Sequence, residues 1–400
     1  MKKLATFLAM ASLPGMALLT PSSAAPLVSI GDSVDVFFRG SVSGQYRSNV
    51  FNNPLKADDY IFIFSPGLEV NIGRNSNANI KIIFREDISW YNRFTNQDSQ
   101  LANLFIDGVY NSGPLTSGAG FSFVQNQQNT ASTAGVATGT NQNEVQRDLY
   151  AAYIKAEYDI SQKTYTTGRF EWNRTDYTNN QDFGNSFSDR DIFTAPLDVL
   201  YRFSPKLDLG LGYRFRYTDV SNNQSNPALG SQTPGDYLDN FVSFSVRGEL
   251  YPKLTTRLNV GWQNRSFNAA GLNDDNTISV LSAFDYEFSP KLDFTAGFNR
   301  DFGTGSIGQS TINTGGFFGT TYNFSQFIAV SSRIDVVNTD YENDPSGRSD
   351  DTIRANTSVT YTPNVYLQFT AAYAYINNSS NINGASFMGH TIDLSASLRY

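Results

Sequence analysis

The stretch from Tyr201 to Thr218 alternates between apolar and polar side chains, and this pattern guides the interpretation of the whole chain. Its apolar positions are Leu207, Leu209, Leu211, Tyr213, Phe215 and Tyr217, and the positions between them are polar or glycine. Successive side chains of a β-strand point to opposite faces of the sheet. The stretch therefore predicts a strand with one apolar and one polar face, and residues 286–302 repeat almost the same pattern.

Eighteen segments of this kind follow one another along the chain. They lie near 33–48, 58–72, 78–92, 99–110, 114–125, 146–160, 163–178, 190–204, 206–219, 237–251, 254–268, 276–288, 291–301, 311–325, 327–340, 349–363, 366–377 and 387–400. An even number of strands is typical of single-chain bacterial barrels. The pair at 99–125 is the least periodic, and the count falls to 16 if this pair folds inward as a loop.

Short corners and longer polar loops alternate between these segments. The corners repeat a Ser-Pro-Lys triplet or a relative of it, as at Ser204-Pro205-Lys206, and the loops are rich in Asn, Gly, Ser and Asp. Short turns of outer-membrane barrels face the periplasm and long loops face outward, so we expect loops such as 303–310 to face outward. The longest polar insert, Gln125 to Glu144, is either an exposed loop or one folded into the lumen.

The N-terminus indicates export. Lys2 and Lys3 precede an apolar run from Leu4 to Leu19, and the small residues 22–24 follow. This pattern predicts a signal peptide over residues 1–24 and a single barrel domain over 25–400. The absence of cysteine excludes a lipid-modified cysteine anchor, disulfides and a thiolate metal site. A net charge of −8 makes the chain a poor candidate for binding nucleic acid.

Composition favours a membrane wall over a soluble sheet. The chain has 31 Phe and 22 Tyr, yet its mean hydropathy is negative. A soluble β-sandwich also alternates, but export, the number of strands and the aromatics near strand ends favour a barrel with an apolar outside and a polar lumen. We predict an all-β fold, a transmembrane antiparallel up-and-down β-barrel of about 18 strands, in contact with the lipids of the bacterial outer membrane.

The chain ends in an amphipathic strand with an aromatic last residue. Leu398 and Tyr400 share its apolar face. Such an ending resembles the signal by which the bacterial barrel-assembly machinery recognises its clients, so we predict that these two residues form an assembly signal and that this machinery is a partner.

Candidate catalytic chemistry is sparse. His390 is the one histidine, and a hydrolase that used a histidine base would depend on it; we expect a rim residue. Gly31-Asp32-Ser33 resembles a lipase block, and 303–308 resembles a phosphate-binding loop, but neither is followed by a predicted helix. The carboxylates within 340–351 are expected to form a solvated outer loop. We predict no catalytic residue, metal site or cofactor, and that the protein is not an enzyme.

The polar faces supply the candidate pore-lining residues. They are Lys81, Arg85, Asp87, Lys155, Glu157, Arg169, Glu171, Asp208, Arg214, Arg216, Arg247, Glu249, Arg257, Arg265, Arg333, Asp335 and Arg354. Opposite charges on neighbouring strands would pair and hold a hydrated interior together. Rings of such charges would also select which solutes pass.

Several short motifs carry a resemblance to a known family. They are the SPGLEVNIG segment (Ser65 to Gly73), the repeated corners, the GLGYRFRYTD segment (Gly210 to Asp219) and the LSASLRY ending. Together they resemble bacterial outer-membrane β-barrel porins, some of which are linked to exopolysaccharide or capsule export. Gln162 and Gln326 depart from the proline usual at the corners. The resemblance implies a porin-like or export role without a defined substrate. We predict a channel for passive diffusion of small hydrophilic solutes. The alternatives are a component of polysaccharide export, or a structural barrel or adhesin without an open pore.

Overall fold

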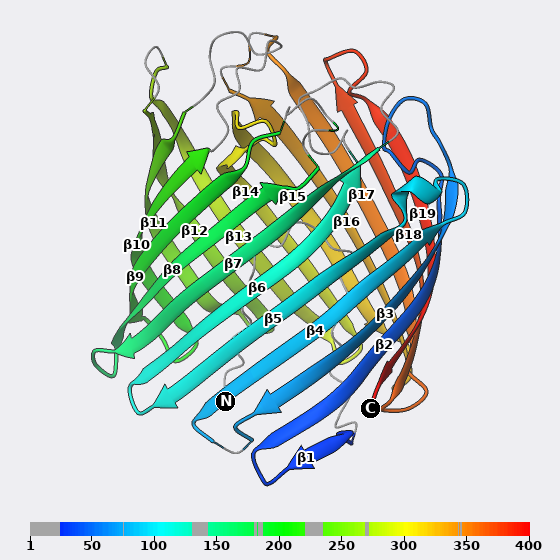
Figure 1. Cartoon of the computed structure of the whole chain (residues 1–400). Coiled ribbons are helices and arrows are strands. Elements are labelled where there is room, and N and C mark those ends of the chain that lie inside the picture. The colour runs from blue at the N-terminus through cyan, green and yellow to red at the C-terminus, as the bar shows by residue number, and fades with distance from the viewer. Residues whose placement is uncertain are drawn as a thin grey trace.

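The computed structural model describes residues 25–74, 76–129, 143–179, 182, 187–220, 235–268, 272–342, 344 and 346–400. Over these residues the chain forms one closed antiparallel β-barrel (Figure 1). Its strands are β1 (Val28–Ile30), β2 (Val34–Arg47), β3 (Asp59–Ile72), β4 (Ala78–Tyr91), β5 (Ser99–Ser112), β6 (Leu115–Asn129), β7 (Glu144–Asp159), β8 (Thr164–Tyr177), β9 (Arg190–Arg202), β10 (Leu207–Val220), β11 (Tyr237–Tyr251), β12 (Leu254–Phe267), β13 (Asp275–Ser289), β14 (Leu292–Thr304), β15 (Ser310–Asn323), β16 (Ile328–Tyr341), β17 (Ser349–Tyr361), β18 (Leu367–Ser380) and β19 (Phe387–Arg399). No helix among the described residues is long and apolar enough to cross a membrane.

The wall of the barrel consists of the 18 strands from β2 to β19. Each strand pairs with the next, and β19 pairs back to β2 from Thr391↔Arg47 to Arg399↔Arg39. The pair β5 and β6 is part of this wall, so the 16-strand alternative is wrong. Each of the 18 predicted segments is a strand, with ends within four residues of the prediction. The predicted signal peptide and residues 130–142 of the polar insert lie outside the described residues.

Strand β1 was not predicted. It pairs with the start of β2, from Val28↔Val36 to Ile30↔Val34. Strand β19 ends beside the next part of β2, where Tyr400 and Phe38 exchange two backbone hydrogen bonds of 2.6 and 2.9 Å. β1 therefore continues the line of β19 and covers the edge of β2 that would otherwise be unpaired.

The short corners gather at one end of the barrel, together with the C-terminus (Figure 1). The recurring serine of the corner explains why the triplet repeats. The Ser204 hydroxyl accepts hydrogen bonds from the backbone N–H groups of Lys206 and Leu207, at 3.3 and 3.0 Å. Ser161 and Ser325 make the same pair of contacts in their own corners. Such side-chain to backbone hydrogen bonds stabilise tight turns.

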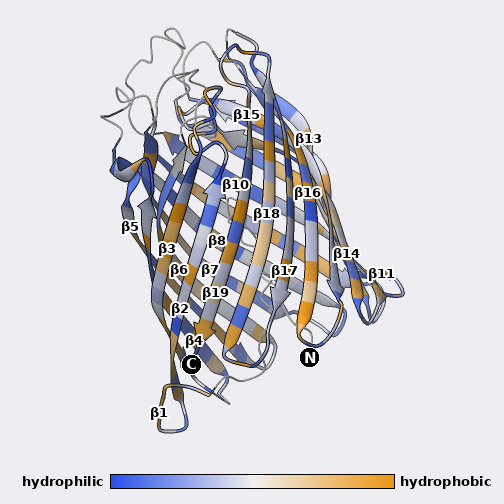
Figure 2. Ribbon diagram, turned by 90° about the vertical axis from the view of Figure 1, so that its right-hand side faces the viewer, coloured by the Kyte–Doolittle hydropathy of each residue, from blue (hydrophilic) through white to orange (hydrophobic). Residues whose placement is uncertain are grey.

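The two faces of the wall differ as the alternation predicts. Apolar and polar positions alternate along each strand (Figure 2). On β10 the Leu211 side chain is 69% exposed on the outside. On the other face of β10, Arg214 reaches Asp301 of β14 at 2.9 Å. Because β10 and β14 are not neighbours in the wall, this ion pair crosses the interior, so the polar face points inward.

These faces determine where the barrel lies. Large apolar side chains are exposed all around the outside, including Ile154, Leu211, Trp262 and Leu394. In hydrocarbon every backbone N–H and C=O group must pair within the protein, and a closed barrel achieves this. A closed barrel with an apolar outside and a polar inside has the architecture of bacterial outer-membrane proteins. The protein is localised to the outer membrane. In barrels of this architecture the short turns face the periplasm, so we assign the end with the short corners to the periplasmic side.

Candidate functional site

The tip of the β14–β15 hairpin leaves the wall and enters the lumen. Pairing between β13 and β14 ends at Val280↔Arg300, whereas pairing between β14 and β15 continues to Thr304↔Ser310. We call residues 301–313 the inner hairpin. Its outer strand stays attached to β16 as far as Thr311↔Tyr341, so the hairpin leans inward from a fixed base.

The tip of the inner hairpin packs against the inside of the wall near the start of β9. The Ser306 carbonyl accepts a hydrogen bond of 2.9 Å from the Ser188 backbone N–H. The Arg190 guanidinium donates one of 2.8 Å to the Gly305 carbonyl. The hairpin therefore reaches from β14 to the start of β9 and crosses the inner face of the strands between them.

An apolar contact holds the tip in this position. Ile307 is buried in a cluster with Val145, Tyr177 and Phe187. The following residue, Gly308, has a φ of +87°, and a Cβ there would lie 2.8 Å from the Val220 Cγ1 atom. Glycine is needed for both the backbone conformation and the close approach. The expectation that loop 303–310 faces outward is wrong, because Ile307 packs inside the barrel against Val145 and Tyr177 of the wall.

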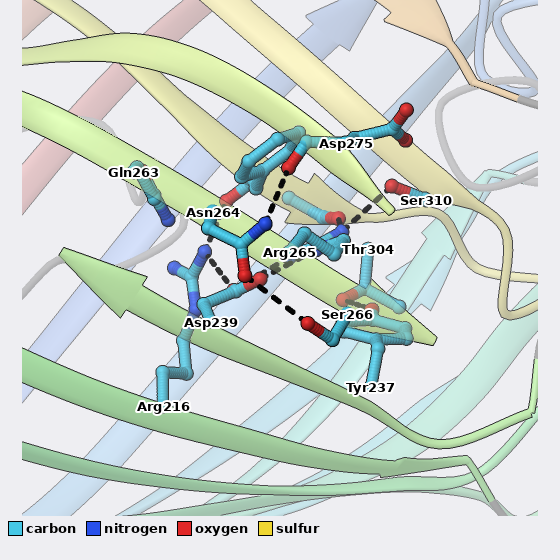
Figure 3. A network of polar contacts seen from close by, with 12 residues as sticks. Arg216, Tyr237, Asp239, Gln263, Asn264, Arg265, Ser266, Asp275, Thr304 and Ser310 are labelled. Carbon is cyan, nitrogen blue, oxygen red and sulfur yellow. Dashed lines mark hydrogen bonds and ion pairs between the residues drawn. The ribbon is translucent and has the colours of Figure 1, made fainter. Parts of the chain in front are cut away.

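A buried ionic network fixes the base of the inner hairpin to β10, β11 and β12 (Figure 3). Arg265 and Asp239 are both 0% exposed and form a bidentate pair, with N···O distances of 2.6 and 2.8 Å. The Arg265 Nη1 group donates to the Gly303 carbonyl and to the Ser310 hydroxyl, each at 2.8 Å. One guanidinium thus joins the wall to both strands of the hairpin.

Two further arginines complete the network. Arg216 donates to Asp239 at 2.6 Å and to Asp301 at 3.2 Å, and Arg214 also contacts Asp301. With Arg265, three cations meet two carboxylates, so the network carries one excess positive charge. Arg216 also donates to the Phe302 carbonyl of the hairpin at 2.8 Å. A buried charge network of this kind is held by its hydrogen bonds, and loss of one member leaves another charge uncompensated.

Aromatic rings enclose the central arginine. The Arg265 guanidinium carbon lies 4.0 Å from the centre of the Tyr237 ring and 4.6 Å from that of Phe302. The Tyr237 hydroxyl hydrogen-bonds to Thr304 of the hairpin. Arg265 is fully buried beside these rings, and the exclusion of water strengthens its ion pairs.

The Glu342 carboxyl group, at the base of the hairpin, has surroundings that disfavour its ionised form. Glu342 directly follows β16, and its backbone N–H donates to the Ser310 carbonyl at 3.0 Å. Burial raises the pKa of the Glu342 carboxyl above its ordinary value, and the nearby Asp275 and Asp340 carboxylates raise it further. The ionised form of Glu342 is therefore disfavoured in the folded barrel.

The predicted pore-lining residues occur mostly as ion pairs. Three pairs join residues two apart on one strand and so on one face: Arg85 with Asp87, Arg169 with Glu171, and Arg333 with Asp335. Others join different strands: Lys81 with Glu69, Arg247 with Glu157, and Arg257 with Asp285. The Arg247–Glu157 pair links β11 to β7 at 3.5 Å, which again crosses the interior.

The remaining predicted residues have more varied surroundings. Asp208 accepts a hydrogen bond of 2.8 Å from the Tyr165 hydroxyl. The Lys155 ammonium lies 5.3 Å from the centre of the Tyr153 ring. Arg354 lies opposite Asp335 in the register of β16 and β17. Glu249 pairs with Lys206 of a short corner at 2.6 Å, which places it at the periplasmic mouth.

Sequence reasoning missed the partners that organise these arginines. Asp239 and Asp301 hold the hairpin network, and Glu69 gathers three cations of the lumen. All three carboxylates occupy polar positions of predicted strands. Alternation could have placed them on the inner face, but it could not show which arginine each one meets.

His390 lies outside the lumen. Its Nδ1 atom is 2.8 Å from the Tyr373 hydroxyl, and its ring contacts those of Tyr373 and Tyr375. The same face of β19 carries the exposed Ile392 and Leu394. Among the residues that the structure describes, no group of three or more His, Cys, Asp or Glu side chains could hold a metal ion.

Comparisons with known proteins find similarity at the level of architecture. The chain matches no protein-family model, and a search of curated proteins finds no match. Among solved structures, OccK3 (OpdO) of Pseudomonas aeruginosa is 12% identical, with 91% of this chain and 96% of that chain covered and a TM-score of 0.48. The outer membrane protein OpdK of P. aeruginosa is 9% identical, with 92% and 99% covered and a TM-score of 0.49. OccAB3 of Acinetobacter baumannii is 9% identical, with 92% and 100% covered and a TM-score of 0.45. Likenesses of this size carry no information about the solute.

Proposed function

We propose that the protein is a porin-like channel of the outer membrane that admits small hydrophilic solutes by passive diffusion. The inner hairpin narrows this channel. The observation that carries this proposal is the inner face itself. It is lined by charged side chains and crossed by a hairpin that is fixed by Arg265 and Ile307. A polar inner wall suits water and hydrated solutes, and an inward loop limits their size.

The hairpin occupies one side of the lumen. Its contacts reach β7 to β12 through Ile307, Arg190, Arg216 and Arg265. A solute would therefore pass along the opposite arc of the wall, formed by β16 to β19 and β2 to β5. This arrangement supports a constriction in the extracellular half of the barrel, because the hairpin contacts the extracellular ends of its partner strands.

Single-channel recording in a planar bilayer tests the proposal. The wild-type protein should give ohmic conductance steps. Ile307→Ser removes the apolar anchor and should increase the step size, because the tip then loses its preferred position. Ile382→Ser, the same change in the β18–β19 turn, is the matched control and should leave the step size unchanged.

Two results would count against the proposal in different ways. A correctly folded wild-type barrel that gives no conductance steps would refute the channel. Steps of equal size in the wild type and in Ile307→Ser would leave a channel but refute the hairpin as its constriction. Folding of each variant is checked by the shift in gel mobility between unheated and boiled samples.

The alternative of polysaccharide export stays a prediction, as does a structural or adhesive barrel. Free inward aromatic rings would favour contact with sugars. Several lumen rings are instead covered by arginines, such as Phe37 by Arg399 and Phe317 by Arg333, each at 3.8 Å. This observation favours small solutes over a polysaccharide. That the protein is not an enzyme also remains a prediction.

We also propose that the barrel-assembly machinery recognises Leu398 and Tyr400. Leu398 is exposed on the outside of β19, and the exposed Tyr400 directly follows this strand and hydrogen-bonds to Phe38 of β2. Leu398→Ser with Tyr400→Ser should lower the amount of folded barrel in the outer membrane while refolding in detergent continues. An unchanged amount in cells would refute this role.

A further inference from the structure

Three cations of the lumen share one carboxylate at the seam of the barrel. Glu69 of β3 lies within 3.3 Å of Arg39 of β2, within 3.6 Å of Lys81 of β4 and within 2.9 Å of Arg399 of β19. We call these four residues the seam cluster. They come from four consecutive strands around the closure between β19 and β2, and they lie in the periplasmic half of the wall.

The carboxylate of the seam cluster is saturated. Its Oε1 atom accepts from Arg399 at 2.9 Å and from the Asn71 amide at 3.0 Å, and its Oε2 atom accepts from Arg399 at 3.3 Å. Glu69 is only 2% exposed. It therefore cannot neutralise three cations, and the four residues together carry two excess positive charges.

Exposure separates the members of the cluster. The Lys81 side chain is 51% exposed and that of Arg39 is 33% exposed. Arg399 is held more closely, because its guanidinium also stacks 3.8 Å over the Phe37 ring. The ammonium of Lys81 and one edge of Arg39 thus remain open to the lumen with hydrogen-bond donors to spare.

Another carboxylate stands near the cluster but is engaged elsewhere. Asp107 lies opposite Lys81 in the register of β4 and β5, and its oxygen accepts a hydrogen bond from the Tyr153 hydroxyl. Even with Asp107 counted, three cations face two carboxylates.

We infer that the seam cluster is an anion-binding site in the pore and makes the channel prefer anions, although the chain as a whole carries a charge of −8. Its ligand would be a carboxylate or phosphate group of a small solute, held by Lys81 and Arg39. Cations that line a water-filled passage raise the local concentration of anions and lower that of cations. This inference rests on the proposed channel function.

The reversal potential across a KCl gradient tests the inference. The wild type should show a chloride preference, and inorganic phosphate should reduce its current. A unit charge acts through water on an ion about 6 Å away strongly enough to change its occupancy about threefold. Lys81→Gln and Arg39→Gln should each lower the chloride-to-potassium permeability ratio by about that factor and weaken the block by phosphate.

Lys163→Gln is the matched control, since it removes the same charge from an exposed periplasmic corner. It should leave the permeability ratio unchanged. A wild-type channel that conducts but prefers potassium would overturn the anion site and leave the proposed function standing. The same conclusion would follow if the Lys81→Gln and Arg39→Gln channels had the permeability ratio of the wild type. A folded wild type that does not conduct overturns both. Gel mobility before and after boiling confirms that each variant is folded.

Discussion

The clearest test of how the wall sits in the membrane is an arginine at Leu211. This residue lies four positions after the start of β10, and its side chain is 69% exposed on the outside. A rise of about 3.3 Å per residue and a strand tilt of about 40° place it ~10 Å above the periplasmic turn. The apolar band of such barrels is about 25 Å tall, so Leu211 lies close to the bilayer midplane.

Leu211→Arg should therefore cost about 2–4 kcal/mol of the free energy of folding into a bilayer. The matched control is Phe203→Arg. Phe203 is also exposed on the outside, at 66%, but it follows the end of β9 at the periplasmic turn. An arginine near the interface should cost only about 0–1 kcal/mol.

Reversible urea unfolding of the refolded barrel from lipid vesicles, followed by tryptophan fluorescence, measures both costs. The two variants share the wild-type loops and lumen, so the difference between them reports depth in the bilayer. Equal costs for the two arginines, or a cost below about 1 kcal/mol at Leu211, would refute the placement of this face in hydrocarbon.

Three further predictions concern the lumen and the hairpin. Gly212→Ala should cost about 1–3 kcal/mol of unfolding free energy in the same urea assay, because its Cβ would lie 2.2 Å from the Asp198 Oδ1 atom; Gly44→Ala, with nothing within 4 Å of the new Cβ, should cost almost nothing. Arg265→Met should lower the free energy of unfolding by about 3 kcal/mol, and by less in an Asp239→Asn background, because each single change leaves a buried charge without its partner. Additive losses would contradict this coupling. Because the pKa of Glu342 is raised in the folded barrel, the wild type loses stability as the pH rises through that pKa. Glu342→Gln should therefore raise the unfolding temperature at pH 7 but not at pH 4. An equal effect at both pH values would exclude ionisation of Glu342 as the cause.

The strands of this barrel could be predicted because period-two alternation depends only on neighbouring residues. The segment from Leu207 to Val220 shows why. Its apolar positions face lipid and its polar positions face the lumen, and a shift of one residue would reverse every side chain. Several corners could be predicted in the same way, because the hydroxyl groups of Ser161, Ser204 and Ser325 accept hydrogen bonds from backbone N–H groups only two and three residues later.

The inner hairpin could not be predicted in the same way. A polar loop exposed to outside water and a polar loop inside a hydrated lumen have the same composition. Ile307 is the one apolar residue within the loop 303–310, and its partners Val145, Tyr177 and Phe187 lie more than a hundred residues away. The closed wall brings these residues together. An isoleucine in a polar loop was therefore visible in the sequence, but the neighbouring residues did not indicate what it packs against.

The ionic partners were hidden for a related reason. Arg214 and Asp301 are 87 positions apart and lie on strands that are not neighbours in the wall. Alternation places both on the inner face, but the contact depends on how the barrel curves. The same holds for Arg399 and Glu69, which meet only because β19 closes on β2.

Exposure distinguishes two uses of charge in this lumen. Arg265 and Asp239 are fully buried, so a passing ion cannot approach them, and their effect is to fix the inner hairpin. Lys81 is half exposed and its partner Glu69 is shared with two arginines, so its charge acts on the solute. Removing Arg265 should therefore change the size of the conductance steps through the hairpin, whereas removing Lys81 should change ion preference and leave the step size nearly constant. Step size and ion preference are measured in the same recordings. If both variants changed the same one of these two quantities, burial would not distinguish the charges that fix the hairpin from the charges that select ions.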